Sequence, residues 1–281
     1  MSTLLEPFHS GFFVNAMAIG TMAGALCGLV GVYVVLRGMS YIGHGLSHAI
    51  TGGAIASFVM HINFYVGAGI WGFVSAMMIN RVARRRIIGA DAAIGVVTTA
   101  SFAVGIALIS RGHGFTRNFE SALFGSILGV TGADLAIVGG VILAVAAIIF
   151  FTYRRLLFTT FDPEVAEASG VNTDRIDSLM AFILAGTIVV TMNFLGVLLV
   201  AAALVIPAVM ARMLTDSFSK MLWMSVVIGA LSGAVGIYAS WFLNIASGPA
   251  IVLTSAALFV VTYAFTGARS MRRLRTADAH L

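Results

Sequence analysis

The sequence is dominated by long apolar runs that are separated by short basic or polar stretches. Most runs are about 20 residues long, which is the length that an α-helix needs to cross a bilayer of about 30 Å. Of the 281 residues, 60% are apolar and only 10% are charged. Backbone polar groups in hydrocarbon need partners within the chain, and the alternating pattern of a membrane β-barrel is absent. The sequence therefore predicts an all-α, polytopic helical membrane protein.

The limits of the apolar runs predict about nine transmembrane helices. One division depends on length alone, because a single helix over residues 179–214 would measure about 54 Å, so we expect two spans that turn near Asn193. Eight spans are the alternative. A further apolar piece, Ser121 to Val130, is too short to cross and suits an interfacial or re-entrant helix. The predicted spans are 12–36, 39–60, 64–80, 92–110, 135–153, two within 179–214, 221–243 and 251–265.

The distribution of Lys and Arg predicts the orientation in the membrane. With nine spans and the C-terminus inside, only Arg111 and Arg117 of the 16 basic residues fall outside. The positive-inside rule therefore places the N-terminus outside and the C-terminus in the cytoplasm. Because the basic residues form short clusters between apolar runs, the net charge of +5 indicates membrane topology and not nucleic-acid binding.

The remaining composition indicates one membrane domain over residues 1–281, because no polar stretch is long enough for a separate soluble domain. No basic segment precedes the first apolar run, which favours a retained span over a cleaved signal peptide. Cys27 is the single cysteine, which excludes an internal disulfide and favours a small buried residue. Glycines at four- and three-residue spacing between Gly20 and Gly31 are typical of close helix packing.

Acidic residues are confined to loops and predicted helix ends, from Glu6 to Asp278. A carrier coupled to protons or sodium usually keeps a carboxylate within the membrane, and none is visible here. A membrane zinc protease would need His-Glu-x-x-His, but Gly45 stands where the glutamate would be. No glycine-rich phosphate loop ends in Gly-Lys-Ser/Thr, so we expect a transport subunit without enzyme activity, and ATP hydrolysis in a separate partner subunit.

Two histidines stand four residues apart in the second predicted span. In a helix, His44 and His48 lie on one face about 6 Å apart along the axis, so both imidazoles can reach one ion. No Asp, Glu, Lys or Arg occurs between Arg37 and Arg81. Two imidazoles with water suit a transient station for a transition metal. The alternative is that both side chains simply bond to Ser, Thr or backbone groups of neighbouring spans.

Polar loops carry two further candidate features. His61, His113 and Glu120 lie on the predicted outer side, either as contacts for an incoming ion or as ordinary solvated residues. The longest polar stretch, residues 159–178, contains Asp162-Pro163 and Gly170, which are typical of a helix start and a helix end. We expect a short helix from Pro163 to Ser169 on the cytoplasmic side.

A series of short motifs runs in order along nearly the whole chain. They are Arg37-Gly38-Met39-Ser40, Gly43-x-x-Leu46-x-His48-Ala49, Ile94-Gly95, Leu123-Phe124-Gly125-x-Ile127-Leu128, Phe161-Asp162-Pro163-Glu164 with Ala166 and Gly170, Gly196-Val197-Leu198, Ile206-Pro207-Ala208 and Ser247-Gly248-Pro249. Each motif is short, but their joint order is specific. The sequence resembles the permease subunits of metal ABC importers, a family that takes up manganese, zinc and iron.

This resemblance implies a permease dimer in the plasma membrane of a prokaryote. It also implies two cytoplasmic ATPase subunits as partners and an extracytoplasmic metal-binding protein that delivers the ion. The residues matching the coupling helix, which docks into the ATPase in this family, are Phe161, Asp162, Pro163, Glu164, Ala166 and Gly170. His44 and His48 match the metal-contacting positions. The transported ion would be manganese or zinc, with iron as a further candidate, and no cofactor is permanently bound.

The sequence departs from the family pattern at His44, where an aspartate is common. A carboxylate beside an imidazole suits manganese, whereas two imidazoles shift the preference towards zinc and similar ions. The pair also lacks the negative charge of a carboxylate, so protonation of the histidines would compete with metal binding at acid pH.

Two other kinds of transporter remain as alternatives. A passive metal channel or a secondary carrier would not need an ATPase, but the missing intramembrane carboxylate disfavours a carrier and the capped inner helix has no obvious use in a channel. The membrane half of an iron-chelate or cobalamin importer would account for the coupling helix. It would leave the paired histidines unexplained.

Overall fold

The computed structural model describes residues 6–84, 90–110, 125 and 129–278. These residues form a short 3-10 helix, one short α-helix and nine long α-helices, and they contain no strand. The helices are η1 (Glu6–His9), α2 (Gly11–Leu36), α3 (Ser40–Val59), α4 (Phe64–Arg84), α5 (Ala90–Ser110), α7 (Gly132–Phe161), α8 (Pro163–Ala168), α9 (Thr173–Leu195), α10 (Val197–Leu214), α11 (Phe218–Leu243) and α12 (Ser247–Asp278).

The predicted helical membrane fold is confirmed. Six of the long helices are long and apolar enough to cross a membrane, namely α2, α7, α9, α10, α11 and the first 20 residues of α12, and α5 contributes a shorter apolar stretch, Ala92–Leu108. The nine long helices correspond in order to the nine predicted spans. The predicted division of residues 179–214 into two helices is also observed.

The observed boundaries differ from the predicted ones where helices continue beyond their apolar part. α7 runs on to Phe161, and α9 begins at Thr173, since capping and turn residues, not hydropathy, decide where they end. The break between α9 and α10 lies at Gly196 instead of Asn193, because Gly196 adopts a φ of +85° that favours glycine. Gly125 lies against this break, where an added Cβ would overlap the backbone of Phe194. Most of the predicted piece from Ser121 to Val130 lies outside the described residues.

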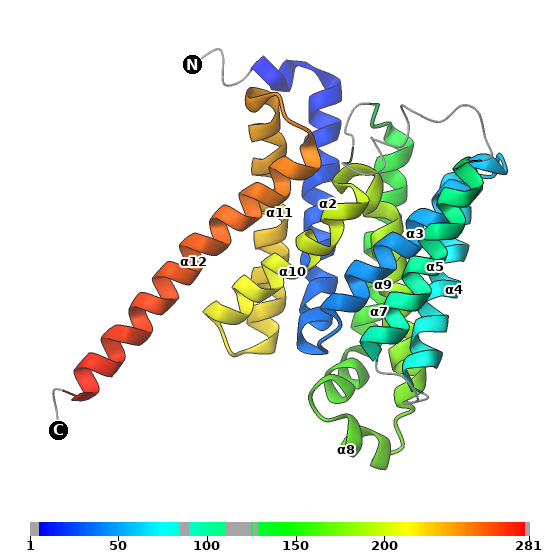
Figure 1. Ribbon diagram of the computed structural model, residues 1–281. Helices are drawn as coiled ribbons and strands as arrows, with labels where there is room; N and C mark the ends of the chain where they lie inside the picture. Colours follow the sequence, from blue (N-terminus) through cyan, green and yellow to red (C-terminus); the bar gives the residue numbers. More distant parts are fainter. Residues whose placement is uncertain (1–5, 85–89, 111–124, 126–128, 279–281) are drawn as a thin grey trace.

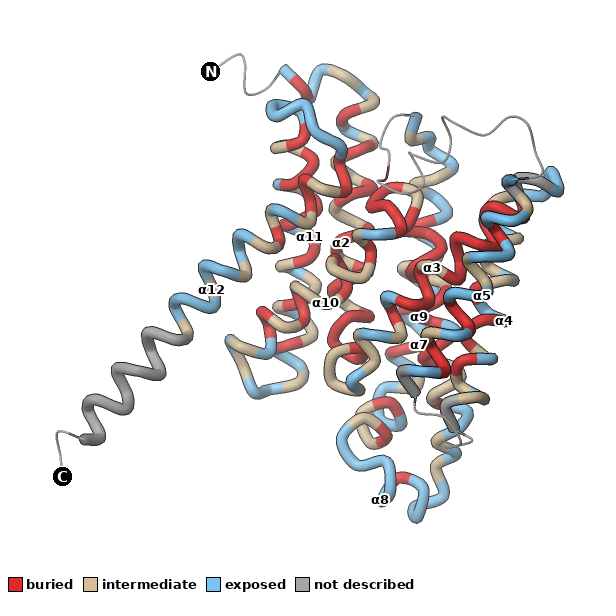
Figure 2. Tube along the Cα trace, viewed as in Figure 1, coloured by how far each residue is buried: buried red, intermediate tan, exposed pale blue. Residues whose placement is uncertain are grey.

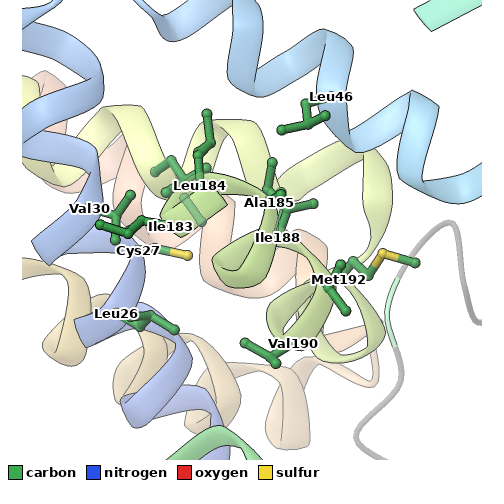
Figure 3. Packing of buried hydrophobic residues seen from close by; sticks show 14 of the residues in the cluster. Leu26, Cys27, Val30, Leu46, Ile183, Leu184, Ala185, Ile188, Val190 and Met192 are labelled. Atoms are coloured by element: carbon green, nitrogen blue, oxygen red, sulfur yellow. The ribbon is translucent and has the colours of Figure 1, made fainter. Parts of the chain in front are cut away.

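The helices form a bundle with the two chain ends at opposite faces (Figure 1). α8 projects from the end of the bundle away from the N-terminus, between α7 and α9, and α12 slants away from the other helices (Figure 1). The buried core centres on α2, α9 and α3, as the red segments in Figure 2 indicate. Figure 3 shows Cys27 on α2 among Ile183 and Leu184 of α9, which confirms that Cys27 is a small buried residue.

Helices α2 and α11 approach each other through the predicted glycine face. A Cβ at Gly24 would overlap the backbone carbonyl of Gly229, and one at Gly28 would overlap that of Ser225. The Ser225 hydroxyl donates a hydrogen bond of 2.7 Å to the Gly28 carbonyl oxygen. Small residues thus allow backbone-to-backbone packing, which drives helix association in lipid where the hydrophobic effect does not.

We expect Gly24→Val to destabilise the folded protein strongly, by about 1–3 kcal/mol or more, because the added side chain forces α2 and α11 apart. The matched control is Gly140→Val on α7, since nothing lies within 4 Å of a Cβ at Gly140. Thermal unfolding of the purified protein in detergent measures both effects. A melting temperature of Gly24→Val equal to that of the control would contradict the close-packing assignment.

Candidate functional site

Helix α3 is held on several sides by close helix contacts. Cβ atoms at Gly45 and Gly52 would overlap Ile94 and Ser101 of α5, and a Cβ at Gly53 would overlap Trp71 of α4. Leu46 is fully buried and lies over Ala185 and Ile188 of α9 (Figure 3). These contacts fix the rotation of α3 about its axis and so determine where its two histidines point.

His44 and His48 lie side by side on one face of α3, which the neighbouring helices cover only in part. Their ring centroids are 4.9 Å apart with the ring planes at 83°, as the four-residue spacing predicts. His44 is exposed and His48 is half-buried, while Gly45, Leu46 and Ser47 between them are buried. Tyr41, one turn earlier, is also exposed. The pair therefore forms part of an open surface and not part of the core of this chain.

Phe102 on α5 orients the second histidine. Its ring centroid lies 5.8 Å from that of His48 in an edge-to-face arrangement. Aromatic edge-to-face pairs are favourable by about 0.5–1.5 kcal/mol, so the contact limits the rotamers of His48. The sequence analysis did not identify Phe102, because no spacing rule relates a residue on α5 to one on α3.

His44 and His48 offer two possible metal ligands. The rest of the described chain brings no third ligand close to them. No group of three or more His, Cys, Asp and Glu side chains lies close enough together there to hold a metal ion. A structural zinc site normally uses four protein ligands. Two imidazoles that leave several coordination positions to water, or to groups from another chain, instead suit an ion that is bound briefly and released.

Of the three outer-side candidates, His61 lies within the described residues and does not join the histidine pair. His61 lies in the exposed turn between α3 and α4 with a φ of +54°. His113 and Glu120 lie outside the described residues. Near the N-terminus of α7, the Tyr65 hydroxyl donates to an Asp134 carboxylate oxygen at 3.0 Å, and Asp134 also forms a capping box with Thr131. Asp134 therefore has a structural role at the start of α7.

The short polar helix is present nearly as predicted. α8 begins at Pro163 and ends at Ala168, one residue before the predicted end, and Ser169 is its C-cap. An Asp162 carboxylate oxygen accepts a 3.0 Å hydrogen bond from the Val165 N–H, as expected for an N-cap. Gly170 follows with a φ of +84°, and its N–H donates to the Glu167 carbonyl oxygen.

Most of the surface of α8 is exposed. Ala166 is fully buried and attaches the helix to the bundle, while Val165 and Phe161 are 49% and 60% exposed. Pro163, Glu164 and Glu167 are also exposed. Figure 2 shows the segment around α8 as largely exposed at the tip of the bundle.

Arg37 lies close to the two ends of the segment that carries α8. In the sequence it only marks the end of a predicted span. It is the C-cap of α2, and its guanidinium donates hydrogen bonds to Thr159 and Thr160 of α7 and to Asp177 of α9. These partners are 122 to 140 positions away in the chain. A pattern in one sequence gives no signal for such a pairing.

Comparisons with known proteins found similar proteins over nearly the whole chain. The ABC 3 transport family matches residues 9–266. The manganese transport system membrane protein MntC of Halalkalibacterium halodurans is 34% identical over 255 residues, which cover 91% of this chain and 87% of that protein. The manganese import system permease protein ScaB of Streptococcus parasanguinis is 34% identical over 276 residues, covering 98% and 97%. The structure of PsaBC from Streptococcus pneumoniae in complex with Fab has a TM-score of 0.85 and 32% identity, covering 93% of this chain and 95% of that chain.

Proposed function

Because this chain belongs to the ABC 3 transport family, we propose that manganese crosses the membrane through it by way of a station formed by His44 and His48. The chain is a membrane-spanning permease subunit of an ATP-driven importer of divalent transition metals. It is an integral protein of the plasma membrane and a transport component, and the ATPase is a separate subunit. Our proposal concerns the transported metal, the residues that bind it and the contacts with partner proteins.

The observation that carries the proposal is the open histidine pair on α3. Ionisable residues within a membrane normally face a bundle interior or a water-filled cavity, because exposure to lipid is costly. His44 is exposed in the single chain. A second copy of the permease that covers this face would supply its own two imidazoles, and the four together would line one pathway. We therefore propose a dimer with the metal station at its interface.

The choice between manganese and zinc depends on His44. The similar proteins MntC and ScaB are named for manganese transport. Imidazole ligands, however, bind zinc more tightly than manganese, whereas a carboxylate suits manganese. We propose that manganese is the transported ion and that the paired histidines make zinc a stronger competitor than an aspartate–histidine pair would.

His44→Asp tests this assignment of the metal preference. We expect it to raise manganese uptake relative to zinc uptake on the order of tenfold, because a carboxylate replaces a softer nitrogen ligand. Uptake of each metal into proteoliposomes that contain the complete transporter measures the ratio. His44→Gln is the control, since it removes the imidazole without adding charge and should lower uptake of both metals. An unchanged ratio in His44→Asp would show that His44 does not select the metal.

The same proteoliposomes distinguish the importer from a channel or a carrier. We propose that two cytoplasmic ATPase subunits dock on α8, and that a metal-binding protein delivers the ion at the opposite end, where the N-terminus lies outside. Metal accumulation should then require ATP and both partners. Metal flux through the purified permease alone would favour the passive channel or secondary carrier.

A further inference from the structure

Arg37 lies at the turn that joins α2 to α3. The turn is tight: the Arg37 N–H donates to the Tyr33 carbonyl oxygen at 3.0 Å and the Met39 N–H to that of Val34 at 2.8 Å. Gly38 permits this reversal with a φ of +67°. α3 starts at Ser40, so His44 and His48 lie about 6 and 12 Å along the helix axis from its first residue. A displacement of Arg37 would therefore also displace the first turn of α3, the helix that carries both histidines.

The side chain of Arg37 holds the chain on both sides of α8. Nη1 donates to Asp177 Oδ1 at 2.8 Å on α9, and Nε donates to Thr160 Oγ1 at 3.0 Å, while Nη2 donates to Thr159 Oγ1. Both threonine hydroxyls donate their own protons to α7 carbonyl oxygens, which leaves their lone pairs for the guanidinium. Thr160 lies two residues before Asp162, the N-cap of α8.

The Arg37 end of this network is buried, while the Asp177 end is partly open to solvent. The side chain of Arg37 is only 7% exposed and that of Asp177 is 39% exposed. Solvent therefore screens the ion pair with Asp177 towards the value of a surface pair, about 0–1 kcal/mol, whereas loss of the buried guanidinium would also leave its two threonine partners without their donor. Each of the three guanidinium nitrogens donates to a different residue, so the plane of the Arg37 guanidinium is held in one orientation.

Open space adjoins this network. A cavity of about 360 Å³ is lined by Arg37, Asp177, Met39, Ile42, Asn80 and Pro163 among others. Close-packed side chains transmit displacement, whereas a void does not. Beside this cavity, the polar contacts of Arg37 link the α2–α3 turn to α7 and α9, in addition to the packing of α3 and α8 on α9.

We propose that Arg37 is a positioning residue that transmits movement of α8 to α3, and so sets how much metal is moved for each ATP hydrolysed. The inference rests on the proposed function, in which α8 receives the movement of the ATPase. A displacement of α8 moves Thr159, Thr160 and Asp177. Through the guanidinium it tilts the α2–α3 turn and shifts the histidine pair relative to the partner permease.

The test is the ratio of metal transported to ATP hydrolysed, measured with Arg37→Gln in the complete transporter. We expect this ratio to fall on the order of tenfold or more, because the guanidinium contacts that join the α2–α3 turn to α7 and α9 are lost. ATP hydrolysis in the absence of metal should stay within about twofold, because the variant does not alter the ATPase or the surface of α8. Asp177→Asn should act in the same direction but more weakly, because it alters only one of the three side-chain partners of Arg37.

Arg37→Lys and Arg154→Gln are the matched variants. Lysine keeps the charge, so Arg37→Lys should fold and recover part of the ratio, although it cannot reproduce the fork of contacts. Arg154 is exposed on α7, and its replacement should leave the ratio unchanged. A purely structural role of Arg37 would lower transport and ATP hydrolysis together with an unchanged ratio, and that result would overturn the proposal.

A distance measurement gives a second, independent readout. Spin labels at Tyr41→Cys on α3 and Ser169→Cys, the C-cap of α8, occupy positions that are exposed in the single chain, while the native Cys27 is buried. In the otherwise unchanged transporter, ATP should shift the distance between the labels, and Arg37→Gln should abolish the shift. A shift that persists in Arg37→Gln would overturn the proposal. Failure of the proposed function would look different, because the wild-type transporter itself would then accumulate no metal with ATP.

Discussion

ATP-dependent manganese uptake should fall by at least about 100-fold when His48 is replaced by alanine, and by a similar factor when His44 is replaced. Changes to groups that only support metal ligands already cost about 10–100-fold, so loss of a ligand should cost at least as much. The described residues contain no group of three or more His, Cys, Asp and Glu side chains that could take over. In a dimer, one substitution also removes two of the four proposed imidazoles.

Initial rates of metal uptake into proteoliposomes measure this effect. The control is His61→Asn, because His61 is exposed in the α3–α4 turn with a φ of +54°, a conformation that asparagine accepts. This control should transport at the wild-type rate. All variants should elute as intact complexes on size exclusion, which separates loss of transport from loss of folding. Wild-type uptake by both alanine variants would exclude the histidine pair from the metal pathway.

The sequence predicted the fold well because lipid imposes a simple rule on each segment. Backbone groups in hydrocarbon must be paired within a helix, so a long apolar run permits little else. The rule describes only the part of a helix that lies in lipid. It therefore does not predict the continuation of α7 to Phe161. It also placed the α9–α10 turn near Asn193, whereas the positive φ at this turn occurs at Gly196.

The site could be predicted only where its residues are close in the sequence. His44 and His48 lie on one turn of helix, and Asp162 with Gly170 brackets one short helix, so spacing and capping rules apply to both. Arg37 and Asp177 are 140 positions apart. Their pairing depends on how α2, α7 and α9 pack together, which one sequence does not reveal. The same holds for Phe102 beside His48.

The geometry of α8 suggests how to detach the ATPase without touching the metal station. Gly170 adopts a φ of +84°, and its N–H donates a 2.9 Å hydrogen bond to the Glu167 carbonyl oxygen. Proline fixes φ near −65° and has no N–H, so Gly170→Pro cannot keep this turn. Glu164 is exposed in the first turn of α8, where a negative charge is favourable, and Glu164→Lys reverses that charge.

We expect Gly170→Pro to lower metal-stimulated ATP hydrolysis on the order of tenfold or more, because the backbone strain of a few kcal/mol displaces α8 from its docking position. Glu164→Lys should act in the same direction. Metal binding to the permease, measured by equilibrium dialysis, should remain unchanged in both. Gly170→Asn is the matched control: nothing lies within 4 Å of an added Cβ, and asparagine tolerates a positive φ.

The coupling-helix variants and the Arg37 variants should fail in different ways. Gly170→Pro weakens the attachment of the ATPase, so less ATPase should co-purify with the permease. Arg37→Gln leaves the exposed surface of α8 intact, so the ATPase should remain attached and hydrolyse ATP without moving metal. Wild-type ATPase stimulation in both Gly170→Pro and Glu164→Lys would remove α8 as the docking element, because neither its geometry nor its charge would then matter to the partner.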